Sequence, residues 1–173
     1  MQQLPPIFGG TLDSARPSHV LGFSEDDLED RYPVQEVSTG LPAIIIPLND
    51  LGALKRCRVD GERYLKLVEG TEAKNVFVFC PKPHEEGNNL AARMFADYYG
   101  VPEDPATGSA AGFLAGYLVE HRYFDAVSVD VRLEQGCEIG RPSLLYPRAR
   151  KEGDEISISV GGKVQMVAKG ELL

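Results

Sequence analysis

An apolar segment that begins at a polar corner constrains the fold of this chain more than any other feature. Residues 103–111 read Glu-Asp-Pro-Ala-Thr-Gly-Ser-Ala-Ala, and apolar side chains follow at Phe113, Leu114, Tyr117 and Leu118. This pattern predicts a helix over about 108–121 that is apolar on most of its sides. Such a helix has to be buried, so the other segments must pack around it.

Most of the other segments are predicted to be strands. Alternating or β-branched patterns indicate strands at residues 2–8, 32–37, 42–48, 75–80, 127–134, 143–150 and 155–160. Gly161-Gly162 fits a hairpin turn into a further strand at 164–169. Ser24 is expected to start a helix, and short helices are predicted at 50–56 and 60–68.

The segment from Leu90 to Tyr99 is compatible with a helix or a strand. We favour a strand, because a strand that ends before the Pro-containing loop delivers Asp104 to the edge of the sheet. Together the segments predict an α+β fold, in which a curved and mostly antiparallel sheet wraps around one central helix.

Size and charge exclude several classes of function. The 173 residues suffice for one domain with a real core, and the net charge of −8 argues against nucleic acid or an anionic membrane as the main partner. No apolar run is long enough to span a bilayer, and the N-terminus lacks the order of a signal peptide. We therefore expect a cytoplasmic protein.

The cysteines and histidines are few and scattered along the chain. They are Cys57, Cys80, Cys137, His19, His84 and His121. No Cys-x-x-Cys pair or other metal-ligand spacing occurs, so the sequence predicts neither a disulfide framework nor a zinc site.

The start of the apolar helix has the chemistry of an anion-binding site. A helix start offers free N–H groups and the positive end of a dipole, which suit a substrate carboxylate. Gly108 permits close approach of the backbone, and Ser109 adds a hydroxyl. Asp104 and Thr107 lie within the same six residues, which is more polar capacity than a cap needs. The alternative is that the stretch is only a structural helix cap.

Four motifs in order along the chain resemble the phenazine biosynthesis PhzF-like isomerases. They are Arg93-Met94-Phe95-Ala96, Glu103-Asp104-Pro105-Ala106-Thr107-Gly108-Ser109-Ala110, Gln135-Gly136 and Gly140-Arg141-Pro142-Ser143. The resemblance implies the diaminopimelate-epimerase-like fold, which has two similar domains, each with a sheet around a central helix, and an active site between them. It also implies proton transfer on a small carboxylate-bearing substrate, with no cofactor and no metal.

The resemblance also implies the roles of individual residues. Asp104 and Ser109 would be catalytic, with Asp104 anchoring polar groups of the substrate or relaying a proton. The groups expected to bind substrate are Thr107, Gly108, Ala110 and Arg141. Arg141 could instead belong to a structural turn. Cysteine-based epimerases of this fold place a thiol at the helix start, and Thr-Gly-Ser here does not support a two-thiol mechanism.

All the matching motifs belong to the second domain of the family. We expect residues 1–10 to be an entering strand between domains and residues 11–173 to be the C-terminal domain, with the first domain and its proton-moving glutamate absent. The chain would then be a truncated product, pair with a first-half polypeptide, or self-associate as a homodimer. Two readings besides the isomerase stay open: a non-catalytic module that binds a small anion or a partner, and a degenerate fragment.

Overall fold

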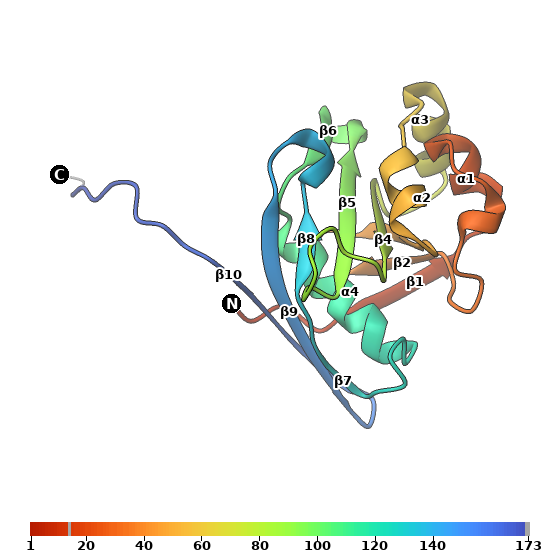
Figure 1. Ribbon diagram of the computed structural model, residues 1–173. Coiled ribbons are helices and arrows are strands. Elements are labelled where there is room, and N and C mark those ends of the chain that lie inside the picture. The colour runs from red at the N-terminus through yellow and green to blue at the C-terminus, as the bar shows by residue number, and fades with distance from the viewer. Residues whose placement is uncertain (14, 172–173) are drawn as a thin grey trace.

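A single curved sheet surrounds one long helix in the computed structural model, which describes residues 1–13 and 15–171 (Figure 1). The helices are α1 (Ala15–Leu21), α2 (Leu51–Arg56), α3 (Gly61–Glu69) and α4 (Gly108–Glu120), with 3-10 turns η1 (Glu25–Asp27), η2 (Asp97–Tyr99) and η3 (Cys137–Ile139). The strands are β1 (Ile7–Thr11), β2 (Gln35–Ser38), β3 (Ala43–Pro47), β4 (Asn75–Cys80), β5 (Leu90–Ala96), β6 (Val101–Asp104), β7 (Ser128–Asp130), β8 (Leu133–Gln135), β9 (Ser143–Glu152) and β10 (Glu155–Gly162).

The sheet runs in the order β1-β2-β3-β4-β5-β8-β9-β10, and β6 and β7 pair with β5 and β9. Two neighbouring pairs, β3 with β4 and β5 with β8, are parallel, and the other pairs are antiparallel. The expected α+β fold, with a mostly antiparallel sheet curved around a central helix, is confirmed.

The inner face of the sheet packs on α4. Every residue of α4 from Ala110 to Val119 is buried, as its nearly uniform apolar sequence requires. Phe77 of β4 meets Phe113 edge to face with ring centroids 5.5 Å apart, and Phe79 meets Tyr117 in the same way at 6.0 Å. These aromatic pairs fix the axis of α4 against the middle of the sheet.

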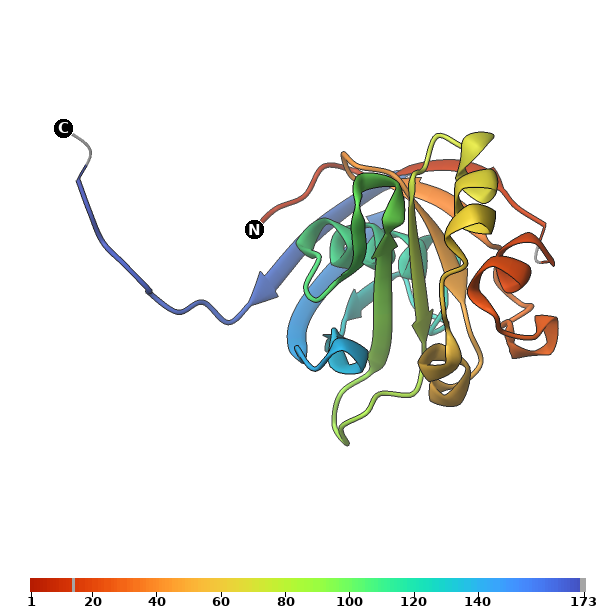
Figure 2. The ribbon, with the colours of Figure 1, turned by 90° about the horizontal axis from the view of Figure 1, so that it is seen from above.

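The outer face of the same strands carries a second core. Ile44 and Ile46 of β3 point away from α4 and pack with α1, α2 and α3, while Ile45 between them faces α4. The three helices lie together on this side of the sheet (Figure 2). Burial on both faces explains why β3 is apolar without alternation, as expected for a central strand.

The first six residues link the two edges of the sheet. The backbone of Met1 exchanges hydrogen bonds of 2.8 Å with Val160 of β10, and β1 then begins at Ile7 on the opposite edge. The segment crosses α4 at Gly112 and Gly116. A Cβ added at Gly112 would lie 2.8 Å from Gln3 Cγ, and one added at Gly116 would lie 3.0 Å from Pro6 Cβ. Glycine at both positions therefore lets this segment close the sheet around the helix.

Several local expectations were wrong. The strand expected over 2–8 begins only at Ile7, with β1. The helix expected at Ser24 is a single 3-10 turn, η1, and the strand expected over 127–134 is divided into β7 and β8. Gly161-Gly162 is not a hairpin turn: β10 runs through it, and residues 163–171 leave the body as an extended segment without strand pairing (Figure 1). Among the described residues, none of the helices combines the length and apolarity needed to cross a bilayer.

Candidate active site

The corner, which we define as residues 104–110, lies where the edge strand β6 passes into α4. Asp104 ends β6 and pairs with Met94 of β5, so its backbone position is set by the sheet. Pro105 and Ala106 form the turn, and Gly108 is the first residue of the helix. A strand at Leu90–Ala96 therefore delivers Asp104 to the edge of the sheet, as the sequence predicted.

The hydroxyl of Thr107 holds the carboxylate of Asp104, and the amide of Gln135 holds Thr107 and the backbone of Asp104. Thr107 Oγ1 donates a short hydrogen bond to Asp104 Oδ2 and accepts one of 3.0 Å from Gln135 Nε2. Gln135 Nε2 also donates to the Asp104 carbonyl at 2.7 Å, and its Oε1 accepts from the Thr107 N–H at 3.2 Å. Gln135 is 1% exposed, so its amide forms a buried base for this network, while Asp104 and Thr107 are partly exposed.

The start of α4 is left without a side-chain cap. Thr107 occupies the N-cap position in an extended conformation, but its side chain caps none of the helix N–H groups. The N–H groups of Gly108, Ser109 and Ala110 precede the first helical hydrogen bond, which Ala111 makes to Thr107, and they have no acceptor among the described residues. These three groups and the dipole of α4 can bind an anion.

Space is open beside the first residue of α4. A Cβ added at Gly108 would meet nothing within 4 Å. The Ser109 hydroxyl has no hydrogen-bond partner in the described part of the chain, while the Ser109 carbonyl accepts from Thr39 Oγ1 at 3.3 Å. Ala110 differs from the other expected binding residues: its side chain is fully buried in the core, so only its N–H can meet a ligand.

Arg141 approaches the corner through its backbone. Its N–H donates to the Gly136 carbonyl at 2.9 Å, and Gly136 lies so close to Pro105 that an added Cβ would be 2.8 Å from the Pro105 carbonyl oxygen. The side chain of Arg141 is exposed and makes no ion pair with any described residue. The backbone therefore builds the turn beneath the corner, and the guanidinium is free.

A buried ion pair anchors the strand that carries Asp104. The guanidinium of Arg93 on β5 binds both carboxylate oxygens of Glu103 on β6, at 3.0 and 2.7 Å. Burial is the largest influence and disfavours the Arg93 charge, but the hydrogen bonds to Glu103 and the attraction of its charge together raise the pKa of Arg93. Both side chains are less than a tenth exposed, so β6 is fixed one residue before Asp104.

None of the three cysteines has the properties of a nucleophile. Burial raises the pKa of Cys57 to about 12 and that of Cys80 to about 11. Cys137 lies outside the helix start, and burial together with the charges of Glu138 and Glu134 raises its pKa to about 11. All three are thiols at neutral pH, which agrees with an active site without cysteine chemistry.

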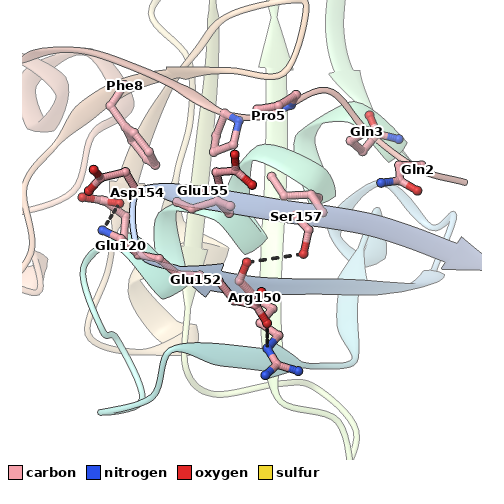
Figure 3. A pocket seen from close by; sticks show the side chains of 14 residues that line it. Gln2, Gln3, Pro5, Phe8, Glu120, Arg150, Glu152, Asp154, Glu155 and Ser157 are labelled. Atoms are coloured by element: carbon pink, nitrogen blue, oxygen red, sulfur yellow. Dashed lines mark hydrogen bonds and ion pairs between the residues drawn. The ribbon is translucent and has the colours of Figure 1, made fainter.

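A cavity of about 670 Å³ lies elsewhere, between the first residues and the β9–β10 hairpin (Figure 3). Its charged lining consists of Glu120, Glu152, Asp154, Glu155, Arg150 and Lys151. The lining has four carboxylates and two cations. Arg150 is paired with Glu152 and Lys151 with Glu120, each at 2.7 Å. A negative lining repels a carboxylate, and none of the corner residues lines this cavity, so we do not assign the substrate to it.

The structure brings most of the expected site residues together and adds one. Asp104, Thr107, Gly108 and Ser109 form one surface at the start of α4. Gln135 was recognised in the sequence only as part of a motif, and no role was expected for its side chain. The available signal was that Gln135 is a polar residue directly after a predicted strand. Its partners Thr107 and Asp104 are 28 and 31 positions away in the sequence, so the sequence does not show the contact.

Comparison with known proteins identifies the family of the chain. The phenazine biosynthesis-like protein family matches residues 1–170. The chain belongs to this family. It is 45% identical over 140 residues to a trans-2,3-dihydro-3-hydroxyanthranilate isomerase of Pseudomonas aeruginosa, covering 80% of the chain and 47% of that protein. It is also 28% identical over 172 residues to an uncharacterized isomerase of Clostridium acetobutylicum, covering 96% of the chain and 57% of that protein.

Solved structures of PhzF-family proteins share the fold. A phenazine biosynthesis protein of the PhzF family from Bacillus anthracis superimposes with a TM-score of 0.84 at 24% identity, covering 94% of the chain and 56% of that structure. A predicted epimerase from Pseudomonas aeruginosa gives a TM-score of 0.73 at 33% identity, covering 100% and 57%. The chain thus spans about half the length of the relatives it matches.

Proposed function

We propose that this chain is the second half of a PhzF-like isomerase, which moves a proton on a small carboxylate-bearing substrate without a cofactor. The observation that carries the proposal is the uncapped start of α4 beside Asp104, whose carboxylate is bound by Thr107 and whose backbone carbonyl is bound by Gln135. A structural cap would use the Thr107 side chain to satisfy the helix N–H groups. Here that side chain holds Asp104, and the N–H groups stay available for a ligand.

The parts of the corner suit different parts of such a substrate. The N–H groups of residues 108–110 and the Ser109 hydroxyl would bind the substrate carboxylate, with the helix dipole favouring its charge. Asp104 would accept hydrogen bonds from hydroxyl or amino groups of the substrate, or relay the proton. A dihydro-hydroxyanthranilate carries these groups, and the Pseudomonas aeruginosa relative is named for its isomerisation.

The base that removes the proton is proposed to come from outside this chain. Glu103 is bound by Arg93, and Glu134 accepts hydrogen bonds from the loop at 84–88, so neither of these two glutamates is free. A base needs unhindered contact with the carbon-bound proton it takes. We propose that a first-half polypeptide or a second copy of the chain supplies this group.

Turnover of trans-2,3-dihydro-3-hydroxyanthranilate tests the proposal. The purified chain alone should show little or no activity. Mixing it with the separately produced part of the Pseudomonas aeruginosa relative that it does not match should restore turnover, and light scattering should report whether the two parts or two copies associate. Robust turnover by the monomeric chain alone would refute the proposed incompleteness.

Substitutions at the corner test the assignment of the site. Asp104→Asn and Ser109→Ala should abolish turnover by the reconstituted pair while circular dichroism stays unchanged. Asp154→Asn and Ser157→Ala, at exposed positions on the β9–β10 hairpin, are the matched controls and should retain full activity. If both corner variants stay fully active, the site is assigned wrongly. If the corner binds anthranilate but no pairing gives turnover, the chain is a non-catalytic anion-binding module.

A further inference from the structure

Four side chains with metal-binding chemistry converge behind the corner. His84 comes from the loop between β4 and β5, Glu134 from β8, and Cys137 and Glu138 from η3. One ligand atom each of His84, Glu134 and Cys137 lie within 4.8 Å of one another. Glu138 joins them, because its Oε1 is 3.0 Å from His84 Nε2.

The groups at the centre of this cluster are buried without hydrogen bonds. The side chain of Glu138 is 9% exposed and that of His84 is 20% exposed. Both carboxylate oxygens of Glu138 and the Nε2 atom of His84 are buried, and no hydrogen bond satisfies them in the described part of the chain. Apart from the 3.0 Å contact with His84 Nε2, the Glu138 carboxylate has no partner among the described residues; such a buried carboxylate is costly, so this arrangement favours a ligand.

Glu134 shows that the loop is held in place to form the cluster. Its carboxylate accepts hydrogen bonds from the N–H groups of His84 and Glu85, at 2.6 and 2.9 Å, and from Asn88 Nδ2 at 2.5 Å. A carboxylate has about four lone-pair positions, so about one remains after these three bonds. Glu134 can therefore fix the backbone of His84 and still donate to a cation.

We propose that His84, Glu134, Cys137 and Glu138 bind one divalent transition-metal ion of the Zn²⁺ class. Nitrogen, thiolate and carboxylate ligands together suit Zn²⁺, whereas Mg²⁺ and Ca²⁺ prefer oxygen alone. Donors on one Zn²⁺ lie roughly 3–4 Å apart, because each bond is about 2.0–2.3 Å long. The 3.0 Å between His84 Nε2 and Glu138 Oε1 fits two adjacent ligands. The ligand atoms of His84, Glu134 and Cys137, which lie within 4.8 Å of one another, would have to move closer by about 1 Å.

The charges around the cluster also favour a cation. Glu134, Glu138 and Glu85 are the acidic groups that act on Cys137, and Lys55 is the basic one. When the Cys137 sulfur binds the metal, the thiol releases its proton to solvent. The resulting thiolate adds one negative charge to those of the carboxylates around it. A divalent cation compensates this excess.

The proposed ion would be structural and does not depend on the proposed isomerase activity. It would tie the loop at 81–89 to η3, and η3 follows Gly136, which lies directly against Pro105 of the corner. The ion would thus stiffen the support of the corner without entering it.

The test titrates the untagged full chain, stripped with chelator, with Zn²⁺ in a calorimeter and with Co²⁺ in an absorption spectrometer. We expect one Zn²⁺ per chain, with heats that depend on the buffer because a proton is released. Co²⁺ should give a thiolate charge-transfer band, and Zn²⁺ should raise Tm. His84→Ala, Cys137→Ser and Glu138→Gln should each weaken binding by roughly tenfold or more.

Matched controls separate the site from incidental binding. His19→Ala removes an exposed histidine elsewhere, and Glu86→Gln removes an exposed acid on the same loop as His84; both should leave the affinity unchanged. Glu138→Gln keeps the shape of the side chain, so this variant tests the site if His84→Ala does not fold. The proposal is overturned if Zn²⁺ binds with no defined stoichiometry, if the thiolate band is missing, or if folded site variants bind as the native chain does. His84 and Glu138 would then be an ion pair only.

Discussion

The Thr107 hydroxyl donates to the Asp104 carboxylate and takes its own hydrogen bond from Gln135, not from the helix that Thr107 begins. A threonine at this position commonly accepts an N–H of the first helical turn. Because its oxygen is used elsewhere, the helix start keeps its free donors and Asp104 keeps a fixed direction. The same side chain thus prepares both the anion-binding and the acidic parts of the corner.

Thr107→Val should disturb both parts at once. The substitution keeps the shape of the side chain but removes the donor to the Asp104 carboxylate and one of the two acceptors of Gln135 Nε2, so the free energy of unfolding should fall by about 1–3 kcal/mol. Anthranilate binding should weaken as well, because Asp104, which is proposed to accept a hydrogen bond from the amino group, loses its orientation. Thr71→Val, which removes a hydroxyl at the end of α3, is the control: it should cost stability but not affinity. Calorimetric titration with anthranilate and urea unfolding measure the two effects, and equal affinities for both variants would contradict this role.

Gly108→Ala and Gly136→Ala should have opposite consequences. A Cβ at Gly108 enters open space, so the variant should fold with unchanged or slightly higher Tm, yet the methyl group occupies the position proposed for the substrate. Gly136 has a φ of 81°, and a Cβ there would press on the Pro105 carbonyl oxygen at 2.8 Å. Gly136→Ala should therefore lower Tm, whereas Gly108→Ala should lower affinity alone. Thermal unfolding measures Tm, and titration with anthranilate measures the affinity. If Gly108→Ala binds anthranilate as tightly as the native chain does, the ligand binds elsewhere.

The sequence predicted the parts of the fold that depend on local pattern. The continuous apolar character of 108–121 located α4, and the isoleucine-rich run at 42–48 located the central strand β3. The alternation over 127–134 misled, because β7 pairs only with β9 whereas β8 also pairs with β5. Periodicity within a segment does not show where its partner changes.

Turns and long-range contacts were the harder part. The β9–β10 hairpin turns at Gly153, where Glu152 pairs with Glu155, although Gly161-Gly162 offered the stronger turn signal. Pairing over the full length of β9 carries β10 through those glycines. The spacing argument against a metal site also does not reveal the cluster that contains His84 and Glu134. These two residues are hydrogen-bonded, but they are 50 positions apart in the sequence. Ligand-spacing rules describe local motifs and are blind to such a cluster.

The Arg93–Glu103 pair should be among the costliest to break. Arg93→Met leaves the Glu103 carboxylate buried without a partner, and such changes cost about 3–5 kcal/mol. The double variant Arg93→Met/Glu103→Leu should recover much of that loss, because it removes both charges. Arg148→Met breaks a pair with Asp130 in which both side chains are more than half exposed, and should cost less than about 1 kcal/mol. Urea unfolding measures all three, and similar losses for Arg93→Met and Arg148→Met would contradict the importance of burial.

His121 should make the chain less stable as the pH falls below neutrality. Burial lowers its pKa in the folded chain below the ordinary value of 6.5, and Nε2 lies 2.8 Å from Gln35 Oε1. Glu120 opposes the shift and Lys151 adds to it. The unfolded chain therefore binds a proton more readily than the folded chain, and stability is lost as the pH falls through about 6.5 towards the folded pKa. His121→Gln cannot titrate, so its Tm should fall less than that of the native chain between about pH 7.5 and about pH 5.5, above the range of ordinary carboxylates. Thermal unfolding across this range measures the difference, and a Tm gap between the two proteins that does not change with pH would show that the His121 proton is not linked to folding.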